Sequence, residues 1–212
     1  MSQKIKIMIL GGARENGKNM YAVQVEDEIF IMDAGLKYPD SSLLGIDVVI
    51  PDLDFFRDYG DKIAGIFLTH GHADSIGALP YILRDYDIPV FGSKLTIELA
   101  KIAVQRENRR RKNDLFHVID ADTEIEFKNA NVSFFKTTHS IPDSLGIDIS
   151  TKEGEIVYTG DSKFDPSAKD GFRTDFVRLS EIAQKGVLAL LSDSTNAEAN
   201  FPNDRQTSIE KY

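Results

Sequence analysis

The stretch Thr69-His70-Gly71-His72-Ala73-Asp74-Ser75 directly follows Ile63–Leu68, a nearly continuous apolar run of strand length. Such a run is typical of a strand that is buried on both faces of a sheet. The stretch contains half of the 4 histidines in the protein, and Gly71 allows a turn sharp enough for the two imidazoles to converge. Nitrogen and carboxylate ligands at this spacing suit zinc or manganese. We therefore predict a metal-binding loop at a strand end, rather than an ordinary polar loop.

Two later strand ends carry further potential ligands. His139 follows the apolar run Val132–Phe135, and Asp161 follows the run Glu155–Tyr158. Each residue taken alone is more typical of a turn than of a metal site. The strands of an α/β sheet deliver their loops to a common edge, however, so we expect both residues to meet the histidine loop there.

The remaining pattern indicates an α/β fold built in layers. Further strands are predicted over the apolar runs Ile5–Leu10, Tyr21–Val25, Ile29–Met32, Gly146–Ile149 and Val187–Leu191. Helices are predicted over residues 94–112, from apolar residues at three- and four-residue steps, and over Phe176–Lys185, before Gly186. The last residues, Thr207–Tyr212, resemble the start of a helix, and we expect the chain to be part of a longer protein.

The composition excludes several classes of protein. A chain of 212 residues with 42% apolar residues can bury one sizeable core, so one domain is expected. The net charge of −9 excludes a uniformly basic nucleic-acid binder, although not a local patch that grips phosphate. With no cysteine, thiolate metal sites and cysteine nucleophiles are excluded. No apolar run has the length of a signal peptide or membrane span, so we expect a cytoplasmic protein with no membrane partner.

Four further stretches carry a family resemblance: 11–21 (GGARENGKNMY), 33–35 (DAG), 138–144 (THSIPDS) and 192–198 (SDSTNAE). Together with the His-x-His-x-Asp motif, the lone His139 and the Gly-Asp at Asp161, they resemble the ribonuclease J family of the metallo-β-lactamase fold. The resemblance implies an αββα four-layer sandwich with a dinuclear metal site. It also implies a hydrolase that cleaves RNA in 5′-to-3′ exonucleolytic and endonucleolytic modes, in rRNA and mRNA maturation. Residues 1–212 would then be the N-terminal portion of a metallo-β-lactamase domain that ends near the insertion point of a β-CASP domain.

The resemblance also implies roles for the candidate residues. His70, His72, His139 and Asp161 would form the first metal position, while Asp74 and Asp161 would remain at the second and act in catalysis. The family motif continues with a histidine where this chain has Ser75, and a hydroxyl is a poor neutral ligand. The second zinc or manganese ion should then be weak or absent and phosphodiester cleavage slow, because two ions together clamp the attacking and leaving oxygens. In this respect the chain resembles the second, degenerate paralogue of the family.

Three hypotheses for the function follow. The first is a weakly active, metal-dependent ribonuclease that acts with a sister ribonuclease J, as a homodimer when full-length and within an RNA degradosome. The second is a non-catalytic subunit of that complex that binds RNA or acts as a scaffold. The third, a hydrolase of thioesters or lactones, is disfavoured because those enzymes keep the histidine at the position of Ser75.

Other polar residues have less specific interpretations. Asp33 either accepts an imidazole N–H and fixes its tautomer or belongs to an ordinary Asp-Ala-Gly turn, and the two interpretations are balanced. The stretch 11–19 lacks the Gly-Lys-Ser/Thr of a P-loop. His117 alternates with apolar residues and is interpreted as structural. A group of basic residues near a helix end is interpreted as a solvated face, with phosphate binding as the alternative. The group consists of Arg106, Arg109, Arg110, Arg111 and Lys112.

Overall fold

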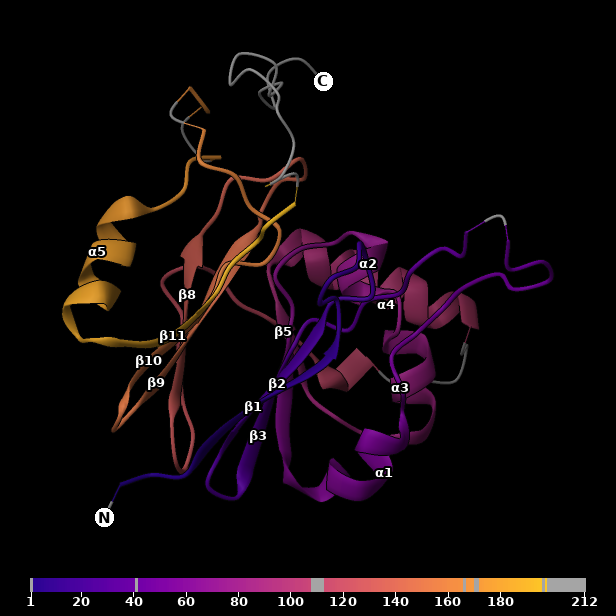
Figure 1. Cartoon of the computed structure of the whole chain (residues 1–212), viewed down its shortest axis with the longest axis horizontal. Helices are drawn as coiled ribbons and strands as arrows, with labels where there is room; N and C mark the ends of the chain where they lie inside the picture. Colours follow the sequence, from indigo (N-terminus) through magenta and orange to yellow (C-terminus); the bar gives the residue numbers. More distant parts are fainter. Residues whose placement is uncertain are drawn as a thin grey trace.

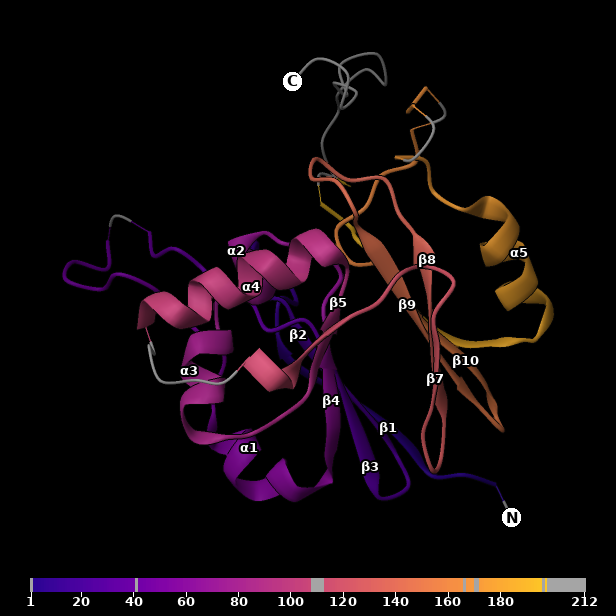
Figure 2. The same cartoon turned by 180° about the vertical axis from the view of Figure 1, so that it is seen from behind.

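A computed structural model of the chain describes residues 2–40, 42–107, 113–165, 167–169, 172–195 and 197. Within these ranges two β-sheets lie face to face, and helices cover the outer face of each (Figures 1 and 2). The predicted α/β layering is therefore confirmed as the four-layer αββα arrangement. The helix start predicted at Thr207–Tyr212 lies outside the described residues. No helix of the described part is both long enough and apolar enough to cross a membrane.

The first sheet is six-stranded within the described ranges. Its strands, in spatial order, are β1 (Ile5–Gly11), β2 (Met20–Val25), β3 (Glu28–Met32), β4 (Ile63–Phe67), β5 (Val90–Gly92) and β6 (Phe116–Val118). The pairs β1–β2 and β2–β3 are antiparallel, whereas β3, β4, β5 and β6 run parallel. The helices of this half are α1 (Asp54–Tyr59), α2 (Ala73–Ile76), α3 (Leu79–Asp85) and α4 (Lys94–Glu107), with 3-10 turns at Gly60–Lys62 and Asn113–Leu115.

The second sheet is five-stranded in the same described part. Its strands, in spatial order, are β11 (Val187–Leu191), β10 (Gly154–Tyr158), β9 (Leu145–Thr151), β8 (Asn131–Lys136) and β7 (Glu124–Glu126). All neighbours are antiparallel except β10 and β11, which are parallel. Helix α5 (Phe176–Gln184) packs on the outer face of this sheet (Figure 1).

Three apolar cores lie between the four layers of the sandwich. Strand β3 contributes side chains to two of these cores, because successive side chains of a strand point to opposite faces. Ile29 and Ile31 belong to the core under helices α1, α3 and α4, whereas Phe30 and Met32 belong to the core between the sheets. A smaller cluster that includes Ile182 joins α5 to the second sheet. Continuous apolar runs therefore mark the central strands, as the sequence predicted.

Most of the predicted elements are present. All eight predicted strands form. Two of them, over the runs Tyr21–Val25 and Ile29–Met32, pair as the β2–β3 hairpin. The helix predicted over residues 94–112 is described as far as Glu107, and residues 108–112 lie outside the described ranges. Helices α1, α2 and α3 and strands β5, β6 and β7 were not predicted, because none of them is longer than 7 residues.

The carboxyl ends of several strands meet at one edge of the sandwich. Strands β3 and β4 are parallel, and β8 and β10 share a direction because each is antiparallel to β9. A backbone hydrogen bond joins the two sheets at this edge, from the amide of Leu145 to the carbonyl of Thr69 at 2.8 Å. A second joins neighbouring loops, from the amide of Lys163 to the carbonyl of Thr138 at 2.9 Å. The loops that carry the candidate ligands are thus fixed to one another through the backbone.

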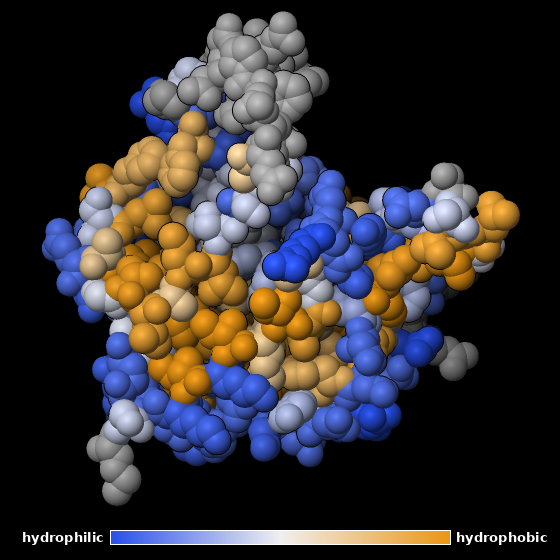
Figure 3. Space-filling model, viewed as in Figure 1, coloured by the Kyte–Doolittle hydropathy of each residue, from blue (hydrophilic) through white to orange (hydrophobic). Residues whose placement is uncertain are grey.

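Exposed apolar side chains gather in two places. Ile9 on β1 and Leu190 on β11 are 60% and 63% exposed, and these strands form the facing edges of the two sheets (Figure 3). The second place is the arm whose ends pair at Lys37 and Val49, where Leu44 is 91% exposed (Figures 1 and 3).

Gly35 lies where the loop after β3 runs against the start of α2. The amide of Ala34 donates to the carbonyl of Ser75 at 2.8 Å, and the amide of Leu36 donates to the carbonyl of Ala73 at 3.0 Å. Between these two bonds, a Cβ on Gly35 would lie 1.5 Å from the carbonyl oxygen of Asp74. The backbones can approach this closely only because residue 35 has no side chain.

We expect Gly35→Ala to lower the free energy of unfolding by about 3 kcal/mol or more, because a backbone carbonyl cannot move aside as a side chain can. Gly60→Ala is the control, since its Cβ would meet only the Tyr86 ring at 3.5 Å. The measurement is urea unfolding of both variants and the unsubstituted protein. Equal stabilities of the two variants would contradict the proposed close approach.

Candidate metal centre

Three imidazoles from two loops converge at the meeting edge. His70 and His72 precede α2, and His139 follows β8. The His139 Nε2 atom lies 3.1 Å from the Nδ1 atom of His72, and the ring centroids of His70 and His139 are 4.6 Å apart. One ligand nitrogen from each ring lies within 4.8 Å of the other two. Two nitrogens bonded to one zinc ion lie at most about 4.2 Å apart, so a small contraction would bring all three onto one ion.

Two carboxylates complete a second, overlapping group. The Nε2 atom of His70 lies 3.8 Å from Asp74 Oδ1 and 4.0 Å from Asp161 Oδ2. His70, Asp74 and Asp161 therefore form a triad that shares His70 with the histidine triad. The structure thus brings together all five residues predicted as metal ligands, His70, His72, Asp74, His139 and Asp161, from three loops that are far apart in sequence.

The electrostatics of this cluster favour a cation. Burial, followed by the neighbouring His139 and His72, lowers the pKa of His70 to about 2, so this imidazole is neutral. Burial and the nearby His72 lower the pKa of His139 to about 4. Burial, with repulsion from Asp74 and Asp193, raises the pKa of Asp161 to about 7. Neutral imidazoles beside crowded carboxylates are the donor set that a divalent ion binds.

Buried atoms without partners support the same conclusion. Among the described residues, His70 Nε2 and Asp74 Oδ1 are buried and have no hydrogen-bond partner. A buried polar atom without a partner costs about 1–3 kcal/mol, and both atoms face the centre of the cluster. The residues present therefore fit a divalent metal ion.

Asp33 holds the histidine loop indirectly. Its carboxylate accepts hydrogen bonds from the Thr69 amide at 2.8 Å, from the Thr69 hydroxyl at 2.9 Å and from the Tyr158 hydroxyl at 2.9 Å. The Thr69 hydroxyl in turn lies 2.9 Å from His70 Nδ1. Of the two balanced interpretations of Asp33, the direct hydrogen bond from an imidazole N–H is not found, because Thr69 lies between the two groups. Burial raises the pKa of Asp33 to about 8, and the hydrogen bonds from Thr69 and Tyr158 act against this shift.

Ser75 lies on α2 and is fully buried. Its hydroxyl oxygen has no hydrogen-bond partner among the described residues. The chain therefore keeps a polar side chain at this position but provides neither an imidazole nor a hydrogen bond. An ion bound at the Asp74 side of the cluster would lack a nitrogen ligand from here.

Two residues near the cluster were not predicted as part of the site. Asp193 follows β11 and accepts a hydrogen bond from the amide of Ser162 at 3.1 Å, which supports the loop that carries Asp161. The Asn19 side chain donates to Asp161 Oδ1 at 3.4 Å. Both residues belong to stretches that carry the family resemblance, 192–198 and 11–21. Their place in these motifs could have indicated that they lie near the site.

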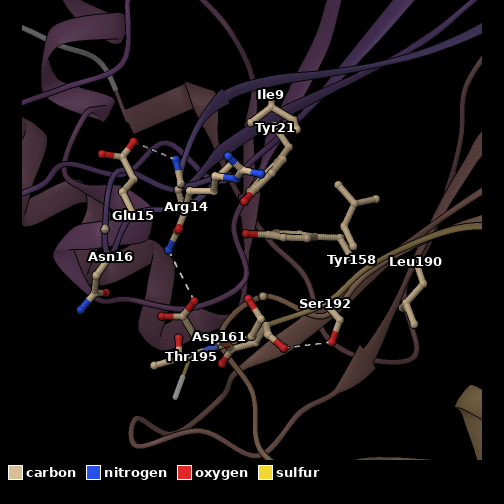
Figure 4. A pocket seen from close by; sticks show the side chains of 18 residues that line it. Ile9, Arg14, Glu15, Asn16, Tyr21, Tyr158, Asp161, Leu190, Ser192 and Thr195 are labelled. Carbon is tan, nitrogen blue, oxygen red and sulfur yellow. Dashed lines mark hydrogen bonds between the residues drawn. The ribbon is translucent and has the colours of Figure 1, made fainter. Parts of the chain in front are cut away.

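A cavity of about 740 Å³ borders the cluster at Asp161. Arg14, Asn16 and Tyr158 lie around the same space, from the first loop and the end of β10 (Figure 4). The cavity gives an extended ligand access to the cluster at Asp161, and Arg14 is a cationic side chain among the residues that line it.

Two other predictions concern residues outside this cluster. His117 lies on β6, where its ring stacks on Phe91 with centroids 4.9 Å apart, in agreement with a structural role. Arg106 is exposed at the end of α4, as expected for a solvated face. The other basic residues of that group, at positions 109–112, lie outside the described residues.

Comparison with known proteins identifies the class. The sequence profile of the Metallo-beta-lactamase superfamily matches residues 13–206, a span that includes every residue of the cluster. The chain belongs to the metallo-β-lactamase superfamily.

Named relatives refine this assignment. The chain is 60% identical over 196 residues to Ribonuclease J 2 of Streptococcus pyogenes serotype M3, and 48% identical over 211 residues to Ribonuclease J 2 of Staphylococcus epidermidis. The resemblance to ribonuclease J and to its second paralogue is therefore confirmed. The alignments cover 92% and 100% of this chain but only 35% and 38% of the relatives, so the chain spans little more than a third of their length.

Solved structures share the fold. The metallo-beta-lactamase fold protein YhfI from Bacillus subtilis superposes with a TM-score of 0.51 at 20% identity, over 77% of this chain and 64% of that one. A protein of unknown function from Enterococcus faecalis gives a TM-score of 0.57 at 19% identity, over 77% and 44% of the two chains. At this identity the likeness concerns the fold alone.

We expect the purified protein to retain one divalent ion per chain after dialysis, measured by elemental analysis. The reason is that the two triads share His70, and one ligand nitrogen binds one ion. We expect His72→Ala to weaken binding by more than about 100-fold, because loss of a ligand's hydrogen-bond partner alone costs about 10–100-fold. His117→Ala, a histidine outside the cluster, should bind as the unsubstituted protein does. Two tightly held equivalents per chain would contradict this prediction.

Proposed function

We propose that the protein is a metal-dependent ribonuclease whose divalent ion, zinc or manganese, is held by His70, His72, His139 and Asp161. The observation that carries the proposal is the convergence of three imidazoles and two carboxylates beside an open cavity. The relatives that bear the name Ribonuclease J 2 support RNA as the substrate.

The side chains of the cluster have distinct tasks in this proposal. When bound, the ion supplies an activated water and neutralises charge on the phosphodiester. His70 and His139 stay neutral and orient the site. Asp74, whose Oδ1 atom has no hydrogen-bond partner among the described residues, can accept the proton of the attacking water. Asp161 assists as a second carboxylate, and Arg14 can pair with a phosphate of the RNA in the cavity.

We further propose that the activity is weak because Ser75 cannot hold a second ion. A single ion cannot clamp both the attacking and the leaving oxygen. The protein would then act in 5′-to-3′ exonucleolytic cleavage, and in endonucleolytic cleavage, during rRNA and mRNA maturation in the cytoplasm. Its partners would be RNA, a sister ribonuclease J and a second copy of the full-length protein, within an RNA degradosome.

Residues 1–212 are proposed to form the N-terminal portion of a metallo-β-lactamase domain, near the point where a β-CASP domain is inserted. The share of the relatives that the chain spans, 35% and 38%, supports a larger whole.

A second candidate function is a non-catalytic subunit that binds RNA or acts as a scaffold for the sister enzyme. The observation that favours it is the buried hydroxyl of Ser75, which has no partner among the described residues and replaces a ligand of the family motif.

The decisive experiment separates these two functions. We expect the full-length protein to degrade 5′-monophosphorylated RNA slowly in the presence of Mn²⁺, and Asp161→Asn to abolish this degradation. We also expect a mixture with the sister enzyme to form a heteromer whose cleavage pattern differs from the sum of the separate patterns. RNA degradation by Asp161→Asn at the full rate would contradict the nuclease proposal. A heteromer with no activity of the protein alone would favour the subunit.

Ser75→His alone is not expected to restore strong nuclease activity to residues 1–212. The position is fully buried, and adding an imidazole there should cost about 1–3 kcal/mol of stability. Substrate positioning by the proposed β-CASP domain would also still be missing. The measurement is degradation of the same RNA, with thermal unfolding as the check on the fold. Robust degradation that a chelator abolishes would contradict this prediction.

A further inference from the structure

The His70 ring is held on its Nδ1 side by Thr69. The Thr69 hydroxyl oxygen lies 2.9 Å from His70 Nδ1, and 3.0 and 2.9 Å from the two carboxylate oxygens of Asp33. A hydroxyl has one proton, so Thr69 donates either to Asp33 or to His70. The direction of this donation decides which nitrogen of His70 carries the hydrogen.

Two arrangements are possible. When Asp33 accepts the Thr69 proton, the Thr69 oxygen accepts a hydrogen bond from His70 Nδ1–H, and Nε2 keeps a free lone pair. When Asp33 donates to Thr69, Thr69 donates to Nδ1, and the hydrogen of His70 is on Nε2. Only the first arrangement leaves Nε2 able to bind an ion, because a ligand nitrogen must be unprotonated.

Tyr158 provides the contact that selects between them. Its hydroxyl donates to Asp33 Oδ2 at 2.9 Å, while the Thr69 amide donates to Asp33 Oδ1 at 2.8 Å. Both carboxylate oxygens thus already receive a hydrogen. These bonds act against the burial that raises the pKa of Asp33, and they favour the ionised carboxylate, which can only accept from the Thr69 hydroxyl. Tyr158 lies at the end of β10 and is 5% exposed, so water competes little for this bond.

The backbone at Asp33 is consistent with a constrained role. Asp33 has a φ of +58° although it is not glycine, and its side chain is fully buried. Its amide donates to the carbonyl of Phe67 at 2.9 Å. A non-glycine residue keeps this left-handed conformation only where its surroundings fix it, and such residues cluster at functional sites.

We propose that Tyr158 is a positioning residue of the metal centre: through Asp33 and Thr69 it keeps the hydrogen of His70 on Nδ1 and the Nε2 lone pair toward Asp74 and Asp161. The inference rests on the metal centre in the proposed function, and it does not depend on RNA as the substrate.

The test is Tyr158→Phe, which removes the hydroxyl and keeps the ring. We expect zinc affinity, measured by calorimetric titration with Zn²⁺, to fall by about 10–100-fold, the usual effect of losing an outer hydrogen bond to a ligand. In the ion-free protein, nitrogen–proton correlation spectra of His70 should show hydrogen moving from Nδ1 to Nε2. Tyr21→Phe is the matched control, since its ring lies 5.2 Å from that of Tyr158 and no hydrogen bond joins it to Asp33.

A second pair of variants tests the connection through Thr69. Thr69→Val should weaken zinc binding, Thr69→Ser should retain it, and Tyr158→Phe should add little to Thr69→Val, because both break one chain of hydrogen bonds. A folded Tyr158→Phe variant with unchanged zinc affinity and an unchanged His70 tautomer would overturn the proposal. If the unsubstituted protein binds no zinc, the metal centre fails, and the His70 spectra of the ion-free protein still decide the role of Tyr158.

Discussion

The crowding of candidate ligand atoms around His70 is the main physical constraint at the edge where the two sheets meet. A neutral, fully buried imidazole presents Nε2 to two carboxylates 3.8 and 4.0 Å away, without a hydrogen bond from any described residue. Burying such groups costs stability unless a partner is present. A divalent cation would satisfy Nε2 and both carboxylates at once. It would also offset the burial and the repulsion from Asp74 and Asp193 that raise the pKa of Asp161 to about 7.

The fold supplies the rigidity that this crowding requires. The candidate ligands lie after the ends of strands β4, β8 and β10, and a backbone hydrogen bond from Leu145 to Thr69 joins the two sheets at the site. Gly160 allows the Asp161 loop to approach the histidine loop closely, because a Cβ at this position would lie 2.7 Å from the Thr69 side chain. The proposed metal centre therefore belongs to the packing of the sandwich itself, whereas Ser75 provides a buried hydroxyl that has no hydrogen-bond partner among the described residues.

The sequence predicted the features that depend on residues close together in the chain. Apolar runs predicted the longer strands, and His70, His139 and Asp161 were recognised as candidate ligands because each follows such a run. The role of Asp33 could not be decided, because its partners Thr69 and Tyr158 are 36 and 125 residues away in the chain. Strand β5 has only 3 residues and carries no period of its own, so it becomes visible only through its pairing with β4 and β6.

We expect one divalent ion to bind where the two triads share His70. The most direct test is anomalous diffraction from crystals of the protein grown with Zn²⁺, measured on both sides of the zinc absorption edge. We expect one strong peak about 2.0–2.1 Å from His70 Nε2, with His72, His139 and Asp161 as the other ligands of the ion, and no comparable peak beside Ser75. A peak of equal strength between Asp74 and Ser75, or no peak at His70, would show that the ion does not bind in this way.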